Sequence, residues 1–268
     1  MKNGYYIVDA HCHIYPDKIA ARAVAGTSNF YDVEFANNGT ISQLLERGEK
    51  AGIDHYIVQS VATTPKQVES INEFIARSVN EHPGMMTGLG TLHPDCEDME
   101  YQVEKIMSLG LKGVKLHPDI QQFKIDDYRC LKIYELCERE HLPILMHTGD
   151  SRYDYSNPNR IVPILEIYDS LVLIGAHLGG YSLWEEAAEK LYQFPNFYVD
   201  CSSSMPFIGT ERVAKIIEYY TPDKVMFGTD YPMWGLTDEV ENFFKMNFSN
   251  EDREKILSKN AQKIYGII

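Results

Sequence analysis

The sequence lacks long hydrophobic runs, Cys-X-X-Cys pairs and a secretory leader pattern. No apolar run approaches the roughly 18 residues that a membrane span needs, and residues 1–15 contain neither an apolar core nor a cleavage site. The five cysteines form no paired framework, so free thiols in a reducing compartment are the simplest interpretation. We therefore expect a cytoplasmic protein that does not associate with membranes.

Basic residues are also scarce relative to acidic ones. The chain has 25 lysines and arginines against 39 aspartates and glutamates, which gives a formal net charge of −14. A chain of this charge repels phosphate backbones and anionic membrane surfaces. Nucleic acid is thus an unfavourable partner, and we expect a small-molecule substrate instead.

Low-complexity segments and Pro/Gly/Ser-rich linkers are absent, so a single domain is expected over residues 1–268. This length suits one α/β barrel, which typically has about 250 residues. Short apolar runs alternate with helical stretches, as in successive βα units. Eight runs read as buried parallel strands: residues 5–10, 55–61, 85–92, 111–116, 143–146, 171–176, 196–201 and 225–228.

Helical patterns lie between these runs, for example at residues 40–51, 128–140 and 183–193. A last helix at about 251–265 is expected to pack on the barrel exterior. Together these patterns predict an α/β fold, a closed (β/α)₈ barrel of the TIM type. The main alternative, an open doubly wound sheet, usually carries a Gly-rich phosphate loop after its first strand, whereas here the first strand ends in His-Cys-His.

The connection after the first strand, residues 14–39, is unusually long and has no clear pattern. Loops of this length are either functional or mobile. At the C-terminal end of strand one it would overhang the mouth of the barrel. Two interpretations stay open: a lid or substrate wall, and an irregular structural loop.

Polar residues follow several of the apolar runs, where catalytic groups of such barrels lie. They are His11, His13, His117, His147, His177 and Asp230. His11 and His13 are two residues apart in a strand, so their side chains point to the same side and can chelate one ion. A divalent-metal site at the barrel mouth is the favoured interpretation. The alternative is a set of separately hydrogen-bonded polar groups.

Five segments carry a resemblance to a known family: VDAHCH, GVKLHP, PILMHTG, GAHLGG and FGTDYP. In this order and spacing the chain resembles the amidohydrolase superfamily. It is most similar to the amidohydrolase-2 branch, which contains hydrolases and non-oxidative decarboxylases of the aminocarboxymuconate-semialdehyde type. The resemblance extends from residue 8 to about residue 260. The motifs are specific for the superfamily and poorly specific for the reaction.

The resemblance implies a site with one divalent ion, Zn²⁺ in the first place and Mn²⁺ as an alternative. Its ligands would be His11, His13, His147 and Asp230. His177 would lie beside the metal and hydrogen-bond water or substrate. Asp230 would also shuttle the proton, which makes Asp230 and His177 the catalytic residues. Homodimers are common among relatives, and the sequence leaves this point open.

Four residues are candidates for substrate binding. Lys115 could pair with a substrate carboxylate or with Asp9, or be carbamylated between two metals, and His117 could line the site. Arg152 could clamp a carboxylate bidentately, which would suit a carboxylate-bearing substrate, or simply lie on the surface. Trp234 could form a wall of the site or pack at its rim.

The motifs leave the reaction open. We place first a hydrolase that attacks a C–O or C–N bond of a lactone, ester or amide through a metal-activated water. The alternative is a metal-dependent decarboxylase, which the compact length disfavours because decarboxylases of this branch tend to be longer. A nuclease of the TatD type would require a strand-four glutamate, where this chain has Lys115 and His117. A binding protein without activity would not need to keep the full ligand set.

Overall fold

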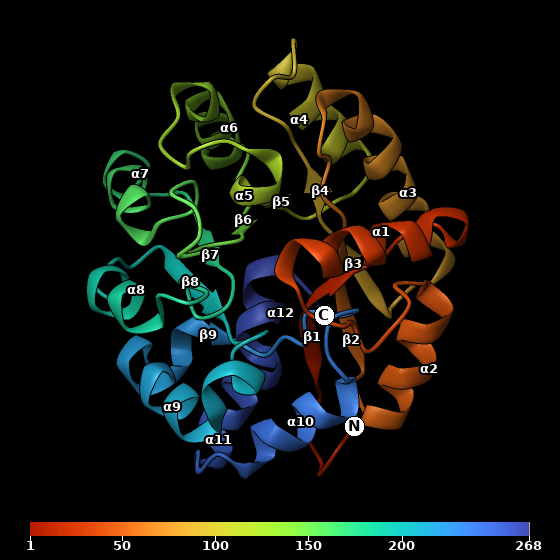
Figure 1. The fold of residues 1–268 in the computed structure, drawn as a ribbon, viewed down its shortest axis with the longest axis vertical. Helices are drawn as coiled ribbons and strands as arrows, with labels where there is room; N and C mark the ends of the chain where they lie inside the picture. Colours follow the sequence, from red (N-terminus) through yellow and green to blue (C-terminus); the bar gives the residue numbers. More distant parts are fainter. Residues whose placement is uncertain (268) are drawn as a thin grey trace.

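The computed structural model of the protein describes residues 1–267, which form a ring of parallel strands surrounded by helices (Figure 1). The strands pair in two runs, β1-β2-β3 and β4-β5-β6-β7-β8-β9. Their bounds are β1 Val8–His13, β2 His55–Gln59, β3 Met86–Gly88, β4 Gly90–Thr91, β5 Val114–Leu116, β6 Ile144–Met146, β7 Leu173–Gly175, β8 Phe197–Asp200 and β9 Val225–Met226.

The two runs of strands join where β3 meets β4. Only Leu89 separates them, and its amide donates to the carbonyl of Val58 at 2.9 Å. The amide of Gly90 donates to the carbonyl of Gly113 at 2.9 Å on the other side. These two short strands are thus the halves of one barrel strand, and the glycines that weaken the apolar run of residues 85–92 mark the break.

The second junction lies between β1 and the chain that follows β9. The amide of Ala10 donates to the carbonyl of Phe227 at 2.8 Å, and the amide of His13 donates to the carbonyl of Tyr231 at 2.7 Å. The strands therefore surround one interior, and the predicted eight-stranded α/β barrel is confirmed.

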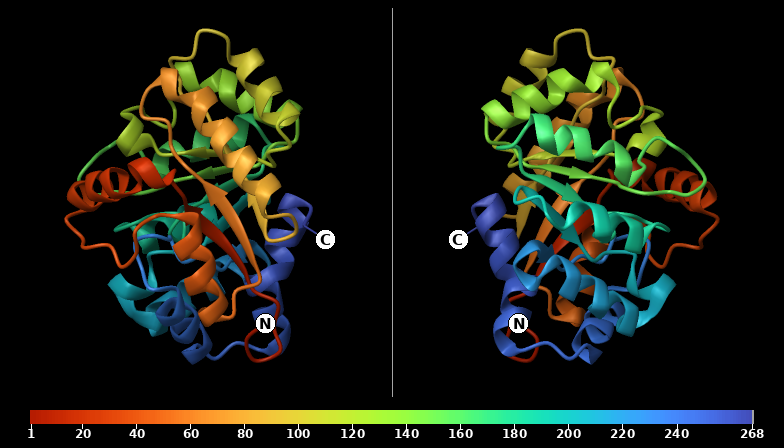
Figure 2. Two further views of the ribbon diagram at one scale, coloured as in Figure 1. Left: turned by 90° about the vertical axis from the view of Figure 1, so that its right-hand side faces the viewer. Right: turned by 90° about the vertical axis from the view of Figure 1, so that its left-hand side faces the viewer.

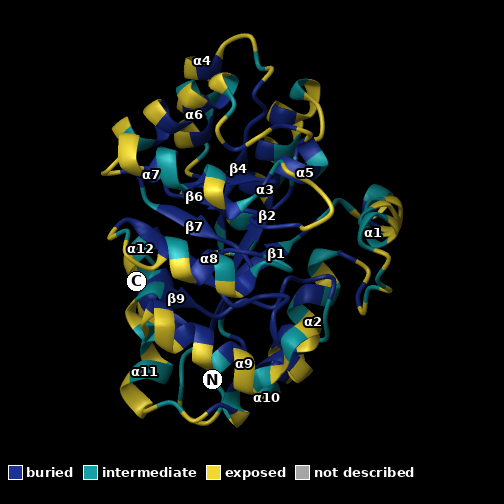
Figure 3. Cartoon of the chain, turned by 60° about the vertical axis from the view of Figure 1, so that its left-hand side comes forward, coloured by how far each residue is buried: buried dark blue, intermediate teal, exposed yellow. Residues whose placement is uncertain are grey.

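Helices cover the outside of the strands, and the strands themselves are buried (Figure 3). No helix within residues 1–267 is long and apolar enough to cross a membrane. The helices are α1 Asp17–Tyr31, α2 Ile41–Ala51, α3 Val68–Glu81, α4 Met99–Ser108, α5 Pro118–Gln121, α6 Tyr128–Arg139, α7 Val162–Ile167, α8 Trp184–Leu191, α9 Met205–Tyr220, α10 Leu236–Lys245, α11 Asn250–Glu254 and α12 Asn260–Tyr265.

The C-terminal helix has a different place from the one that the sequence suggested. A π-helical turn, Lys255–Lys259, joins α11 to α12. Ala261 and Tyr265 of α12 pack against inward-facing strand residues such as Val8 and Leu145. The prediction that this helix packs on the barrel exterior is wrong, because its apolar side covers the end of the barrel opposite α1 (Figure 2).

The connection after β1 also differs from the sequence expectation. Most of it is the helix α1, which begins after Pro16 and ends at Asp32 in a left-handed conformation with φ 53°. It crosses the barrel at the end where β1 finishes (Figures 1 and 2). Both interpretations of the sequence, a lid or substrate wall and an irregular loop, lack this helix, because α1 has no apolar stripe and Ala20 is its only buried residue. The helix faces a cavity and not a packed core.

Candidate active site

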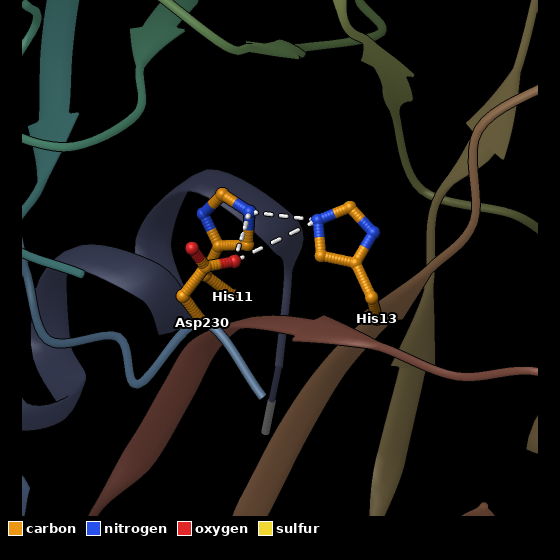
Figure 4. A group of neighbouring side chains, drawn as sticks. All are labelled: His11, His13 and Asp230. Atoms are coloured by element: carbon orange, nitrogen blue, oxygen red, sulfur yellow. Dashed lines mark hydrogen bonds and ion pairs between the residues drawn. The ribbon is translucent and has the colours of Figure 1, made fainter. Parts of the chain in front are cut away.

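The polar residues at the strand ends converge at the barrel mouth, as the sequence predicts. His11 and His13 project from β1 and Asp230 from the chain after β9 (Figure 4). The Nε2 atoms of the two histidines are 3.1 Å apart. Oδ1 of Asp230 lies 3.4 Å from Nε2 of His11 and 3.8 Å from Nε2 of His13. One ligand atom from each residue therefore faces a common point.

The chemistry of this trio fits a divalent cation. Nδ1 of His11 lies 2.9 Å from Oδ2 of Asp200, and a carboxylate only accepts, so Nδ1 donates and Nε2 keeps its lone pair toward the trio. A metal-ligating histidine usually has such a carboxylate behind it. Burial above all holds the pKa of His13 well below its usual value, which keeps this ring neutral. Two neutral imidazoles and a carboxylate are typical ligands of a catalytic metal.

Asp200 is a buried carboxylate with several partners. Burial alone would raise its pKa, but His11 and His177 nearby and a hydrogen bond from Ser202 lower the pKa overall. Its side chain is therefore an anion that can orient His11. The sequence analysis did not identify Asp200. Asp200 is the last residue of β8, and the histidines of the site likewise lie at the ends of their strands.

A second group of imidazoles lies beside the trio. Nε2 of His177 is 3.1 Å from Nδ1 of His147. The ring of His117 stacks on that of His147 with centroids 4.0 Å apart. His147 therefore reaches the trio through His177, whose ring stacks on His11 at 5.2 Å. The structure thus places the predicted ligand His147 in the same site as the trio. Its ligand atom, however, lies close to those of His117 and Asp119, which together form a second potential metal-binding group.

The imidazoles of this second group are held in their neutral form. Burial lowers the pKa of His177 to about 4 and holds the pKa values of His117 and His147 well below the usual range. Nδ1 of His177 lies 3.1 Å from the carbonyl oxygen of Ser202, which can only accept. Nδ1 thus carries the proton in this hydrogen bond, and Nε2 is left as an acceptor.

Asp230 is positioned by hydrogen bonds on its outer oxygen. Ser203 donates to Oδ2 at 2.5 Å, and Nε1 of Trp234 donates to the same serine hydroxyl at 2.8 Å. Burial alone would raise the pKa of Asp230, but His11, His177 and the serine lower it overall. Asp230 is therefore a carboxylate at neutral pH with Oδ1 turned toward the histidines.

Four residues at this site adopt the left-handed backbone conformation that favours glycine, and one of them is Ser203 at φ 50°. The others are His177 at φ 58°, Leu178 at φ 56° and Asp230 at φ 57°. Non-glycine residues hold such angles only where surrounding contacts impose them, and they cluster at functional sites. The two predicted catalytic residues are both among them.

Lys115 is fully buried at the floor of the site. Its Nζ lies 3.0 Å from Nε2 of His11, and burial lowers its pKa to about 8. Pairing of Lys115 with Asp9, one of the interpretations of the sequence, is wrong. Asp9 accepts instead from the backbone amide and the hydroxyl of Thr229 at 2.9 and 2.6 Å.

The other two predicted substrate residues have protein partners. The guanidinium of Arg152 binds Asp150 through two hydrogen bonds of 3.0 and 2.7 Å and donates to the carbonyl of Phe30 at 2.7 Å. It thereby ties the loop after β6 to α1. Trp234 supports Ser203, as described above. Neither side chain is among those that line the cavity at the mouth.

This cavity has a volume of about 780 Å³, within the usual range for a small-molecule site. His11, His13, Lys115, His117, His147, His177 and Asp230 form its floor, and α1 forms one wall. The hydroxyl of Tyr31, on α1, lies 2.7 Å from Nε2 of His117. Tyr31 could not be found from sequence, because its place in the site depends on a helix that the pattern does not predict.

The structure is similar to several solved barrels. An uncharacterized TIM-barrel protein from Bordetella bronchiseptica is 20% identical with a TM-score of 0.81, over 98% of this chain and 99% of that chain. 5-Carboxyvanillate decarboxylase from Sphingomonas paucimobilis is 15% identical with a TM-score of 0.78, over 99% and 100%. Dihydroxybenzoic acid decarboxylase from Polaromonas sp., with bound manganese and the inhibitor 2-nitroresorcinol, is 16% identical with a TM-score of 0.74, over 98% and 97%.

These similarities establish the fold. No curated protein sequence matches the chain. The amidohydrolase family model matches residues 8–267. This match confirms the resemblance carried by the five sequence motifs, and the chain belongs to the amidohydrolase family.

Proposed function

We propose that the protein is a metal-dependent decarboxylase that releases CO₂ from a hydroxylated aromatic acid. The observation that carries this proposal is the position of Asp230, a buried carboxylate beside a histidine pair fit for a cation, at the floor of a cavity. The similar structures add support, since two of those described above are decarboxylases of aromatic acids. The sequence alone favoured hydrolysis and kept decarboxylation as the alternative.

The length of the chain no longer favours hydrolysis. The similarity to 5-carboxyvanillate decarboxylase extends over 99% of this chain and 100% of that chain. A compact barrel of this kind is therefore compatible with decarboxylation. Hydrolysis of a lactone, ester or amide becomes the second candidate, because the same residues could serve it.

We propose that His11, His13 and Asp230, whose ligand atoms face a common point, hold one divalent ion. His147, the fourth ligand that the resemblance implies, is hydrogen-bonded to His177 in the neighbouring group. Such an ion would neutralise the oxygens of a bound hydroxy acid and draw electron density from its ring. Manganese now stands beside zinc as a candidate, because the similar dihydroxybenzoic acid decarboxylase binds manganese.

The residues of the chain account for the proton transfers. The Asp230 carboxylate takes the proton from the hydroxyl next to the substrate carboxylate and delivers it to the ring carbon that carries this carboxylate. The bond from that carbon to the carboxylate then breaks, its electron pair restores the aromatic ring, and CO₂ leaves. The phenolate oxygen finally takes a proton from water, so that one CO₂ is released for each proton consumed.

The surrounding groups favour this sequence of steps. Lys115, with a pKa of about 8, stays largely protonated at neutral pH and attracts the substrate carboxylate. The neutral rings of His117 and His177 can accept or donate hydrogen bonds without adding positive charge. We therefore assign to Asp230, an anion at neutral pH, the movement of the proton between oxygen and carbon.

The test uses the purified protein loaded with Mn²⁺ or Zn²⁺. It is assayed for CO₂ release from 2,6-dihydroxybenzoate and 5-carboxyvanillate, and for hydrolysis of a panel of lactones, esters and amides. CO₂ release that a chelator abolishes supports the proposal. Hydrolysis in the second panel with no CO₂ release in the first would overturn it in favour of the second candidate.

A further inference from the structure

The cavity extends well beyond the histidines, to side chains of α1 and α3. The side chains that line this outer part come from both helices: Lys18, Ile19 and Arg22 from α1, and Ile71, Phe74 and Arg77 from α3. A site that only holds a single aromatic ring at the histidines has no use for this extension. The outer part therefore calls for a separate explanation.

Three cations line the outer part of the cavity. Within residues 1–267, Lys18, Arg22 and Arg77 have no carboxylate within ion-pair distance, and the Arg77 guanidinium carbon lies 6.0 Å from the ring centroid of Phe74. The acidic side chain that also lines this part, Glu73, is paired with Lys105 at 3.7 Å. The cavity of a chain with a net charge of −14 thus has a positive outer end.

Apolar side chains line the cavity together with the histidines and the three cations, among them Val61, Ile19, Ile71 and Phe74, and polar ones such as Ser60 and Gln67 lie beside them. A ligand complementary to this arrangement has an acidic group at the floor, an apolar middle and a second acidic group at the outer end. Arginine is well suited to the outer contact because its planar guanidinium binds carboxylates and phosphates bidentately.

We propose that Arg22 and Arg77, assisted by Lys18, form a second anion subsite, so that the substrate is an elongated acid with an anionic group at its non-reacting end. The proposal rests on the proposed function in one respect, namely that the reacting end lies at the histidine cluster. The second anion bridges α1 and α3. Its binding therefore also fixes the wall of the cavity over the substrate.

The test measures binding and does not depend on turnover. The Mn²⁺-loaded protein is titrated calorimetrically with linear dicarboxylates from glutarate to sebacate and with the matching ω-monoamides. The monoamide keeps one carboxylate for the floor and loses the second charge. For the length that spans the cavity, the dicarboxylate is expected to bind about tenfold more tightly, as for a charged hydrogen bond at a partly exposed site.

Two variants and one control locate the effect. Arg22→Gln and Arg77→Gln are each expected to remove most of the tenfold preference and to leave the monoamide affinities unchanged. Arg47→Gln is the control, because Arg47 is an exposed arginine on α2 outside the cavity and its loss changes the net charge by the same amount. The preference is expected to persist in this variant.

The outcomes separate this inference from the proposed reaction. A dicarboxylate preference lost in the two variants supports the subsite even if no CO₂ is released from any aromatic acid. Equal affinity for dicarboxylates and monoamides at every length overturns the subsite even if 2,6-dihydroxybenzoate is decarboxylated. A preference that Arg47→Gln weakens as much as Arg77→Gln also overturns it, because long-range attraction would then be the cause.

Discussion

The floor of the cavity and its α1 wall are held in place in different ways. On the floor, each ring nitrogen of His11 has a partner and the side chain is almost fully buried. On α1, Ala20 is the only buried residue, and Lys18 and Arg22 are exposed. The floor is built from strand ends fixed by the barrel, and the wall from an inserted helix with few constraints. Reaction chemistry and substrate choice can therefore change separately.

The largest effect is expected on the floor, at Asp230. Asp230→Asn removes the group that we propose moves the proton, so turnover should fall by about 10²–10⁴-fold, the usual range for a lost general acid–base group. The measurement is CO₂ release at saturating Mn²⁺. Ser203→Ala keeps the carboxylate and should cause a much smaller loss. Undiminished turnover in Asp230→Asn would show that the assigned role is wrong.

A smaller effect is expected at Asp200, which supports His11 from outside the cavity floor. Asp200→Asn weakens the orientation of His11, so metal affinity should fall by about 10–100-fold, as for other carboxylates behind a ligating histidine. The metal affinity of each variant is measured by competition with a chromophoric chelator. Asp150→Asn is the matched control, since Asp150 is equally buried but binds Arg152 at the wall. If both variants lose metal equally, floor and wall are not independent.

A third prediction concerns the dependence of protein stability on pH, and it tests a buried carboxyl group close to Asp9 and Asp230. Glu239 of α10 is buried, and burial, with Asp9 and Asp230 nearby, raises its pKa to about 8. The folded protein thus holds this proton more tightly than the unfolded chain, and the free energy of unfolding falls as pH rises from about 4.5 toward 8. Glu239→Gln should stabilise the protein by about 1–3 kcal/mol at pH 9 and little at pH 5.

Urea unfolding at the two pH values measures this difference. Glu241→Gln provides the control, because Glu241 lies on the same helix with its side chain 57% exposed. It should change stability little at either pH. An equal gain for Glu239→Gln at pH 5 and pH 9 would mean that ionisation is not the cause.

The smallest effect is expected at the wall. Tyr31→Phe removes the hydroxyl that lies 2.7 Å from Nε2 of His117. The Michaelis constant of the substrate found in the assays should rise about threefold to tenfold while kcat changes little, as for one lost hydrogen bond in binding. Tyr153→Phe, on the neighbouring loop, is the control. A loss of metal affinity in Tyr31→Phe would contradict the separation of wall and floor.

The sequence predicts the floor far better than the wall. His11, His13, His177 and Asp230 each follow an apolar run, and parallel strands bring their C-terminal ends to one mouth. The rule that polar residues at the C-terminal ends of barrel strands lie at the mouth also applies to Asp200, at the end of β8. The residues of the floor can therefore be predicted from the local sequence pattern together with the rule that parallel strands of a barrel end at one mouth.

The wall and the closed end of the barrel depend on tertiary contacts that no local pattern encodes. α1 covers a cavity and so lacks an apolar stripe, which left residues 14–39 without a predicted structure. Arg152 has an ordinary sequence context, and its contact with the carbonyl of Phe30 exists only because α1 lies across the mouth. The sequence predicts a last helix at about 251–265 but places it on the barrel exterior, whereas α12 packs against inward-facing strand residues.

The left-handed backbone at His177 and Asp230 has an evolutionary consequence. Such conformations cost of order 1–3 kcal/mol each for a side chain larger than glycine. Replacing Asp230 by glycine would release this cost along with the chemistry. Selection for thermal resistance alone would therefore erode the active barrel, and laboratory evolution of this chain toward heat tolerance needs a simultaneous screen for turnover.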